Sequence, residues 1–288
     1  MKIKMSTGGM STFIITWFGQ VVSLIGSGLT SFALGVWVFE RTGSPTLFAL
    51  IGLFAVVPKV IFSPLAGALV DRWDRRTVMI LADLGAGLST LFIALMLFAE
   101  RLELGHIYLA SGLSSLFGTF QWPAYTAAVT QLVPHRHLGR ANGMNQFGRA
   151  AAEIFSPLLA GVLVLTIQLQ GVILIDVITF GFAMLSLIIV RFPKLDTTPP
   201  QDHFSTFKED LTFGWKFILA RSGLLNLLFF QTTINFIWGM VGALIVPLIL
   251  SFTTSDQLGA IITIAGTGML TGSLVMTAWV GRSAASMG

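Results

Sequence analysis

Apolar residues are grouped along the chain into eight long runs, which short polar segments separate. A helix needs about 20 mostly apolar residues to cross a hydrocarbon core of about 30 Å, and the runs are near that length or longer. Lipid cannot hydrogen-bond an open backbone, so the pattern predicts α-helices, whereas a β-barrel would show alternating segments of about 10 residues. The expected spans are Phe13–Phe39, Leu47–Val70, Thr77–Ala99, Ile107–Val129, Ala141–Leu165, Val172–Val190, Leu224–Phe252 and Leu258–Val280.

The composition indicates that lipid is the main solvent of the chain. Hydrophobic residues make up 54% of the 288 residues and charged residues only 10%, whereas soluble domains carry about 25% charged residues. The first apolar run is longer than the roughly 7–15 residues of a signal-peptide core, so we interpret it as the first span. The chain contains no cysteine, which excludes disulfides and thiolate metal sites within it.

The basic residues predict an orientation. Of the 17 lysines and arginines, thirteen fall on one side of the predicted topology and only Arg41 and Arg101 on the other; Lys59 and Arg149 lie inside spans. Because cytoplasmic loops are enriched in Lys and Arg, the N-terminus is expected in the cytoplasm, in a bacterial inner membrane. The net charge of +4 is then a topological signal and predicts no nucleic-acid partner.

The spacing of the runs divides the chain into two blocks. A segment of about thirty residues without a span follows the sixth run, and within it Ser205–Leu219 has apolar residues at helical spacing, which predicts a helix on the cytoplasmic membrane surface. Gly67–Val70 is echoed by Gly272–Val275, which indicates an internal repeat. The expected units are a six-span bundle (1–190), a cytoplasmic linker (191–223) and a partial second bundle of two spans (224–288).

The connection between the second and third runs carries a recognisable motif. It contains Gly67, Leu69, Asp71, Arg72, Arg75 and Arg76. With these residues it resembles the signature loop of the major facilitator superfamily, with Asp74 in place of the second glycine. Gly67 is expected to permit close helix approach, and the family uses this loop as a conformational latch. A positive patch that only fixes topology is the alternative.

Three further stretches resemble the bacterial enterobactin-exporter and macrolide-efflux branch, namely Pro123–Pro134, Ala141–Gly161 and Ile175–Phe180. The resemblance implies an all-α major facilitator fold and proton-coupled export of a small amphiphilic molecule, drug-like or siderophore-like, by alternating access. Complete members have twelve spans, so the chain is expected to be C-terminally incomplete, with the missing spans as its partner. The alternative is a truncated or degenerate protein that is inactive or depends on a partner.

The fifth run also resembles the antiporter signature of the family. Gly143, Pro157 and Gly161 match it, while alanine and serine occupy the other glycine positions. The resemblance implies export. A face of small residues that packs against a neighbouring helix explains the same pattern without any transport role.

Ionisable residues inside the predicted spans are functional candidates because burying them in lipid costs at least a few kcal/mol each. Arg149 and Glu153 lie four residues apart, so they share a helix face and can pair. With Lys59 they are expected to line a polar cavity in which Glu153 exchanges a proton, or else to form a structural pair. Asp83 and Asp176 lie near span ends and are expected to be structural.

In the family, the first, fourth and seventh spans border the substrate cavity. The resemblance therefore implies substrate contacts from amide and aromatic side chains, which suit an amphiphilic molecule, although helix packing would also explain them. The candidates are Gln20, Gln121, Trp122, Gln231, Asn235 and Trp238.

Enzymatic chemistry is not indicated. The four histidines, His106, His135, His137 and His203, lie outside the spans, and no acidic cluster or nucleophile motif accompanies them. The sequence predicts neither a cofactor nor a metal site.

Overall fold

The structure, a computed structural model, describes residues 9–190, 216–254 and 257–261, together with residues 264, 267, 268 and 271. Regular structure within these described residues is entirely helical. The elements are α1 Met10–Thr42, α2 Pro45–Arg72, α3 Arg75–Phe98, α4 Leu104–Leu132, the 3₁₀ helix η1 His135–His137, α5 Leu138–Ile189 and α7 Ser222–Leu250.

Helix α5 consists of two helices that meet at Gln168. The backbone there has φ 59° and ψ 179°, a conformation that few residues other than glycine adopt. Before the bend, α5 runs parallel to α1: Trp17 donates to the carbonyl of Met144 (3.0 Å), and Ser156 donates to the carbonyl of Ile25 (3.1 Å). The bend falls within the connection that the sequence predicted between its fifth and sixth spans.

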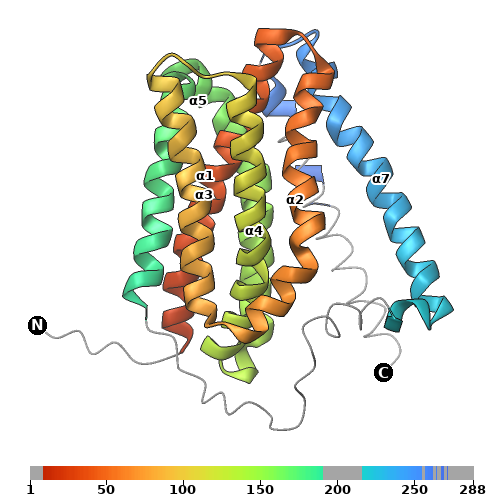
Figure 1. Ribbon diagram of the computed structural model, residues 1–288. Helices are drawn as coiled ribbons and strands as arrows, with labels where there is room; N and C mark the ends of the chain where they lie inside the picture. Colours follow the sequence, from red (N-terminus) through yellow and green to blue (C-terminus); the bar gives the residue numbers. More distant parts are fainter. Residues whose placement is uncertain are drawn as a thin grey trace, which may run out of the picture.

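After the bend, α5 runs antiparallel to α1 along a seam of small residues. Gly19 lies against Ser186 and Ala183, while Gly26 lies against Thr179. Later positions in α1 therefore meet earlier positions in α5, which makes the two helices antiparallel. Helix α1 is therefore packed between the two halves of α5 (Figure 1). Small residues at such a seam let two helices approach closely, as is common between helices in membranes.

The connections between helices are short because local capping ends each one sharply. Gly43 adopts a left-handed conformation (φ 61°) after α1, and Ser44 then accepts from the backbone N–H of Leu47 (3.3 Å) to begin α2. At the start of α4, Glu103 and His106 cap each other's backbone N–H groups. These tight turns return the chain into the bundle, where α2 and α3 both pack on α4.

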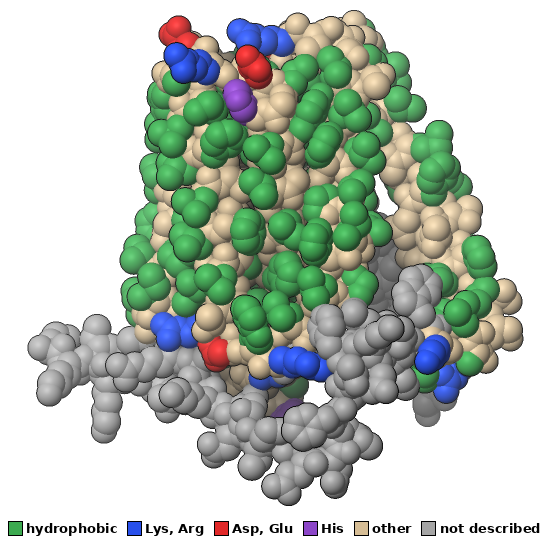
Figure 2. Space-filling view, in the orientation of Figure 1, with side chains coloured by type: hydrophobic (Ala, Val, Ile, Leu, Met, Phe, Trp, Pro, Cys, Tyr) green, Lys and Arg blue, Asp and Glu red, His purple; other side chains and the backbone are tan. Residues whose placement is uncertain are grey.

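The surface has the distribution that a bilayer requires. Figure 2 shows apolar side chains covering the middle of the bundle, with charged side chains gathered toward its two ends. Many large apolar residues are exposed, among them Phe18, Val60 and Leu165, each at least 60% exposed. Among the described residues, five helical segments are long and apolar enough to cross a membrane, and one of them, His135–Ile189, contains the hairpin of α5. The protein is therefore a multi-pass membrane protein.

Seven of the eight predicted spans fall on described helices. The exception is Leu258–Val280, most of which lies outside the described residues, as do Gly272–Val275 and most of the predicted surface helix Ser205–Leu219. The division into two bundles stays a prediction.

Helix α7 lies beside α2 at the end of the bundle remote from the N-terminus and diverges from it toward the other end (Figure 1). At the remote end, Ile249 and Leu258 are buried against Val36 of α1.

The seam between α1 and α5 yields a test of packing. A Cβ added at Gly19 would lie 2.5 Å from Ser186 Oγ and 2.8 Å from its Cβ, whereas a Cβ at Gly181 meets nothing within 4 Å. Both changes to alanine gain up to about 1 kcal/mol of helix propensity. We expect Gly19→Ala to lower the free energy of unfolding by about 1–3 kcal/mol through overpacking, and Gly181→Ala not to lower it. Thermal melting in detergent measures the difference, and equal melting temperatures would contradict the seam.

Candidate functional site

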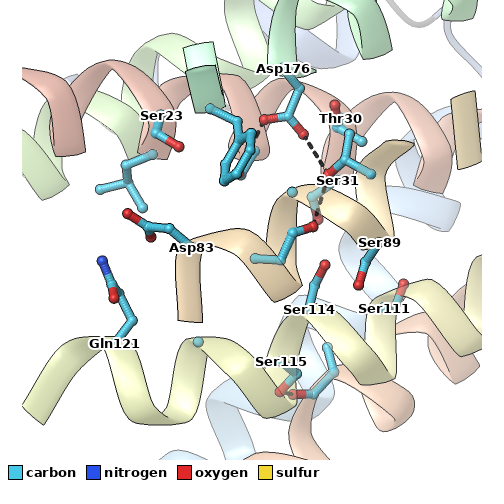
Figure 3. Close-up of a pocket in the computed structure, with 18 of the residues that line it drawn as sticks. Ser23, Thr30, Ser31, Asp83, Ser89, Ser111, Ser114, Ser115, Gln121 and Asp176 are labelled. Carbon is cyan, nitrogen blue, oxygen red and sulfur yellow. Dashed lines mark hydrogen bonds between the residues drawn. The ribbon is translucent and has the colours of Figure 1, made fainter. Parts of the chain in front are cut away.

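A cavity of about 550 Å³ lies inside the bundle, between α1, α2, α3, α4 and both halves of α5. Figure 3 shows Asp83 and Gln121 projecting from α3 and α4 on one side of it, and Asp176 on another. Serines of α4 follow one wall, and aromatic rings contribute apolar surface. Its charged, amide and aromatic lining residues are Trp17, Gln20, Lys59, Asp83, Gln121, Trp122, Tyr125, Asn145, Arg149, Asp176 and Phe180.

The polar groups lie deep in the bundle. The backbone N–H of Gly9 donates to the carbonyl of Leu132 (3.0 Å), so the start of α1 and the end of α4 lie at the same end of the molecule. Gln20 is about 15 Å along α1 from that end, Asp83 about 12 Å along α3, and Gln121 about 16 Å along α4, at 1.5 Å per residue. All three are near the middle of a hydrocarbon core of about 30 Å.

Asp83 is held by amides rather than by a cation. Gln20 Nε2 donates to Asp83 Oδ2 (2.8 Å), and Gln121 Nε2 donates to Gln20 Oε1 (2.9 Å). Asp83 is 8% exposed. The sequence placed it near the end of a span in a structural role, because distance along one helix does not reveal which face turns toward a cavity.

Asp176 is the second buried carboxylate of the cavity and is 2% exposed. Ser27 donates to one of its oxygens (3.1 Å) and Thr90 to the other (3.3 Å). These bonds join α1, α3 and the second half of α5, so Asp176 ties three helices together. The structure places it in the cavity wall rather than near a membrane surface.

The predicted pair between Arg149 and Glu153 is wrong. The guanidinium carbon of Arg149 lies 3.4 Å from the ring centroid of Trp122, a cation–π contact across α5 and α4. Glu153 is exposed and does not line the cavity. A spacing of four residues would allow the pair, but the Arg149 guanidinium lies over the Trp122 ring instead. Lys59 lines the cavity from α2.

The candidates on α7 do not reach this cavity. Gln231, Asn235 and Trp238 are all exposed, and the Asn235 amide donates to the Gln231 carbonyl of its own helix (2.7 Å). The residues that line the cavity come from α1 to α5, so the α7 candidates are not part of its wall.

The signature loop contacts the ends of α3, α4 and α5. Asp74, at the position of the second family glycine, caps α3 by accepting from Thr77 N (2.9 Å) and Thr77 Oγ1 (2.9 Å). Arg76 donates to the carbonyls of Leu187 (2.9 Å) and Ile188 (2.8 Å) at the end of α5. The replacement of glycine by aspartate is thus accounted for by helix capping.

Other residues of the loop have different surroundings. With the Gln131 amide oriented so that its oxygen faces the guanidinium, Arg75 donates through Nε to that oxygen (2.9 Å) near the end of α4. The expected close helix approach at Gly67 is wrong for the described residues, because nothing lies within 4 Å of an added Cβ. Leu69 accepts from the backbone of Trp73 at the end of α2, Arg72 is exposed there, and the side chain of Asp71 lies outside the described residues.

The packing motif of α5 is only partly a packing face. Gly143 is exposed and has open space around it, Pro157 is half-buried, and Gly161 is buried. The contacts with α1 come instead from a row at every fourth position that includes the buried Gly148 and Ser156.

Sequence reasoning missed the hydroxyl groups of the cavity. Ser23, Ser27 and Thr30 continue from Gln20 along one face of α1 at intervals of three or four residues. A polar stripe of this periodicity within an apolar run was the available signal. Tyr125 also lines the cavity and donates to Asn145 Oδ1 (2.8 Å).

Comparison with known proteins places the chain in a family. The model of the Major Facilitator Superfamily matches residues 16–287. The chain therefore belongs to this superfamily, whose members are membrane transporters rather than enzymes. The resemblance seen in the signature loop is confirmed.

Similar proteins include bacterial efflux proteins. Macrolide efflux protein A of Streptococcus pyogenes is 30% identical over 267 residues, which are 92% of this chain and 65% of that protein. Its namesake in Enterococcus faecalis is 29% identical over 78% of this chain and 70% of its own length. The multidrug efflux pump Tap of Mycobacterium bovis is 23% identical over 73% of this chain and 52% of its own length. The chain thus spans 65% of the length of the Streptococcus protein that it matches.

Arg76 provides a test of the signature loop. Replacing it with alanine removes two donors from carbonyls at the end of α5, and each charge-assisted bond contributes about 1.5–3 kcal/mol. We expect Arg76→Ala to lower the melting temperature clearly and Arg76→Lys not to restore it, since an ammonium lacks the fork of the guanidinium. Arg136→Ala, an exposed change on η1, is the matched control. Equal melting temperatures for Arg76→Ala and Arg136→Ala would contradict this role.

Proposed function

We propose that this protein is a secondary exporter that exchanges protons for a small amphiphilic molecule, and that the cavity of the six-span bundle holds the proton-carrying group. The observation that carries the proposal is Asp83, a carboxylate 8% exposed near mid-membrane whose described partner is an amide rather than a cation. An ionised group in such a place costs several kcal/mol. Taking up a proton relieves that cost, so protonation and the state of the cavity are coupled.

The geometry favours Asp83 over Glu153 for this role. Glu153, the candidate from sequence, is exposed and is not among the residues that line the cavity. Asp176 is satisfied by two hydroxyl groups and acts as a structural tie between helices.

An amphiphilic substrate suits the lining of the cavity. A volume of about 550 Å³ lies within the range of about 300–1,000 Å³ typical of sites for drug-sized ligands. Trp17, Trp122 and Phe180 supply flat apolar surface, while amides and hydroxyls supply hydrogen bonds. The similarity to macrolide and multidrug efflux proteins supports the same substrate class.

Alternating access is supported by the position of α7. The helix packs near α1 and α2 at the end remote from the N-terminus and diverges at the other end, as an inward-open state of such an exporter would. We assign the N-terminal end to the cytoplasm, because it carries the arginines of the signature loop and of η1.

Neutralising Asp83 tests the coupling. In proteoliposomes that contain the protein as its gene encodes it, we expect Asp83→Asn to lower ethidium transport driven by a pH gradient at least about ten-fold, because the amide cannot carry a proton. Glu153→Gln makes the same chemical change outside the cavity and should stay within about two-fold of wild type.

Wild-type flux must also disappear when an uncoupler collapses the gradient. Full flux in Asp83→Asn would remove Asp83 from the mechanism, and wild-type flux without a gradient would refute proton coupling altogether.

Single cysteines test the orientation, since these 288 residues contain none. We expect a membrane-impermeant maleimide to label Arg101→Cys, in the connection before α4, in intact cells. Arg136→Cys, on η1 at the opposite end, should react only after permeabilisation, because the arginine-rich end faces the cytoplasm. The opposite labelling pattern would show that the N-terminus faces outward.

A further inference from the structure

The side-chain amides of Gln20 and Gln121 connect Asp83 to a buried oxygen atom that has no hydrogen-bond partner among the described residues. Gln20 donates to Asp83, Gln121 donates to Gln20, and Gln121 Oε1 is buried without a hydrogen-bond partner among the described residues. Leaving a buried acceptor unpaired is costly, so native proteins rarely do it without a reason. Gln121 lines the cavity, so water or a bound molecule in the cavity can supply the missing donor.

The ionised state of Asp83 fixes the direction of both amides. A carboxylate only accepts, so Gln20 must present its NH₂ group to Asp83 and its oxygen to Gln121. Gln121 must then present its NH₂ group to Gln20 and its own oxygen to the far side. This is the arrangement in the structure.

Protonation reverses the series. A proton taken from cavity water onto Asp83 Oδ2 turns this oxygen into a donor. The Gln20 amide then turns over, so that its oxygen accepts from Asp83 and its NH₂ group donates to Gln121 Oε1. The Gln121 NH₂ group now occupies the position that its oxygen held. Apart from the O–H bond on Asp83, no covalent bond forms or breaks.

We infer that Gln20 is a positioning residue that transmits the protonation of Asp83 to Gln121, so that the cavity binds hydrogen-bond-donating amphiphiles when Asp83 is ionised and releases them when it is protonated. This inference rests on the proposed function and specifies its substrate class and its coupling step. By linkage, a bound donor also favours release of the proton.

Other charged and titratable groups face Asp83 across the cavity. They are Lys59 on α2, Tyr125 on α4, and Arg149 and Asp176 on α5; the residues of α1 in the cavity wall carry no ionisable group. Tyr125 is bound to Asn145, Arg149 lies on Trp122, and Asp176 is bound to Ser27 and Thr90. None of these contacts supplies a donor to Gln121 Oε1. The two amides, both of which lie within reach of the Asp83 carboxylate, therefore connect Asp83 to that atom.

Two lipophilic cations distinguish the reversal of the two amides, here called the relay, from simple attraction between the cation and the Asp83 carboxylate. Ethidium carries amino groups that donate hydrogen bonds, and tetraphenylphosphonium carries none. Protonation of Asp83 removes a negative charge and weakens both. The loss of the acceptor at Gln121 weakens the binding of ethidium alone. We expect this to lower its affinity by a further factor of about ten, which corresponds to about 1.4 kcal/mol.

The experiment measures Kd for both cations on the purified protein between pH 8 and pH 5.5, in wild type, Gln20→Leu, Gln121→Leu and Asp83→Asn. We expect the extra loss of ethidium affinity at low pH in wild type only. In Gln20→Leu, which keeps Asp83, the two cations should weaken equally. Gln121→Leu removes the terminal amide by a different substitution and should give the same result, so a folding defect in one variant leaves the test intact.

The outcomes are distinct. An extra pH-dependent loss for ethidium that persists in both Leu variants would overturn the relay while leaving proton-coupled export in place. Equal weakening of the two cations in wild type would do the same. Failure of both cations to bind wild type at any pH would refute this cavity as the substrate site, and with it both proposals.

Discussion

The cost of placing polar groups at mid-membrane governs this structure. Asp83 and Asp176 cannot face lipid, so five helices, one of them folded into a hairpin, enclose them in a cavity. Within that enclosure each carboxylate is satisfied by neutral donors rather than by a cation: amides for Asp83, hydroxyls for Asp176. The small-residue seam that holds α1 between the halves of α5 makes this close arrangement possible.

Much of the fold could be predicted from the sequence because lipid allows few choices. An apolar run of sufficient length must be a helix, and the runs from Phe13 to Phe252 are helical in the structure. The break at Gln168 falls in a predicted connection, although the residue at the break is neither glycine nor proline. The sequence also contained the signature loop, and the family assignment follows from it and from the match over residues 16–287.

The site was harder to predict, since a sequence gives position along a helix but not the alignment of neighbouring helices. Asp83 and Asp176 looked peripheral when counted from the ends of their own spans, yet both line the cavity. Arg149 and Glu153 have the spacing of an ion pair, but the guanidinium of Arg149 contacts the ring of Trp122 on another helix. Gln20 and Gln121, which the sequence offered as substrate contacts, both line the cavity, but their bond to each other depends on the packing of α1 against α4.

The central claim is that occupation of the cavity and ionisation of Asp83 are one equilibrium. Proton release on binding tests this most directly: ethidium is added to the purified protein in weakly buffered solution near the midpoint of Asp83 titration, and a pH indicator counts protons. The proposal predicts saturable release in wild type that follows binding and is absent in Asp83→Asn. Saturable binding without any proton release at any pH between 5.5 and 8 would contradict it.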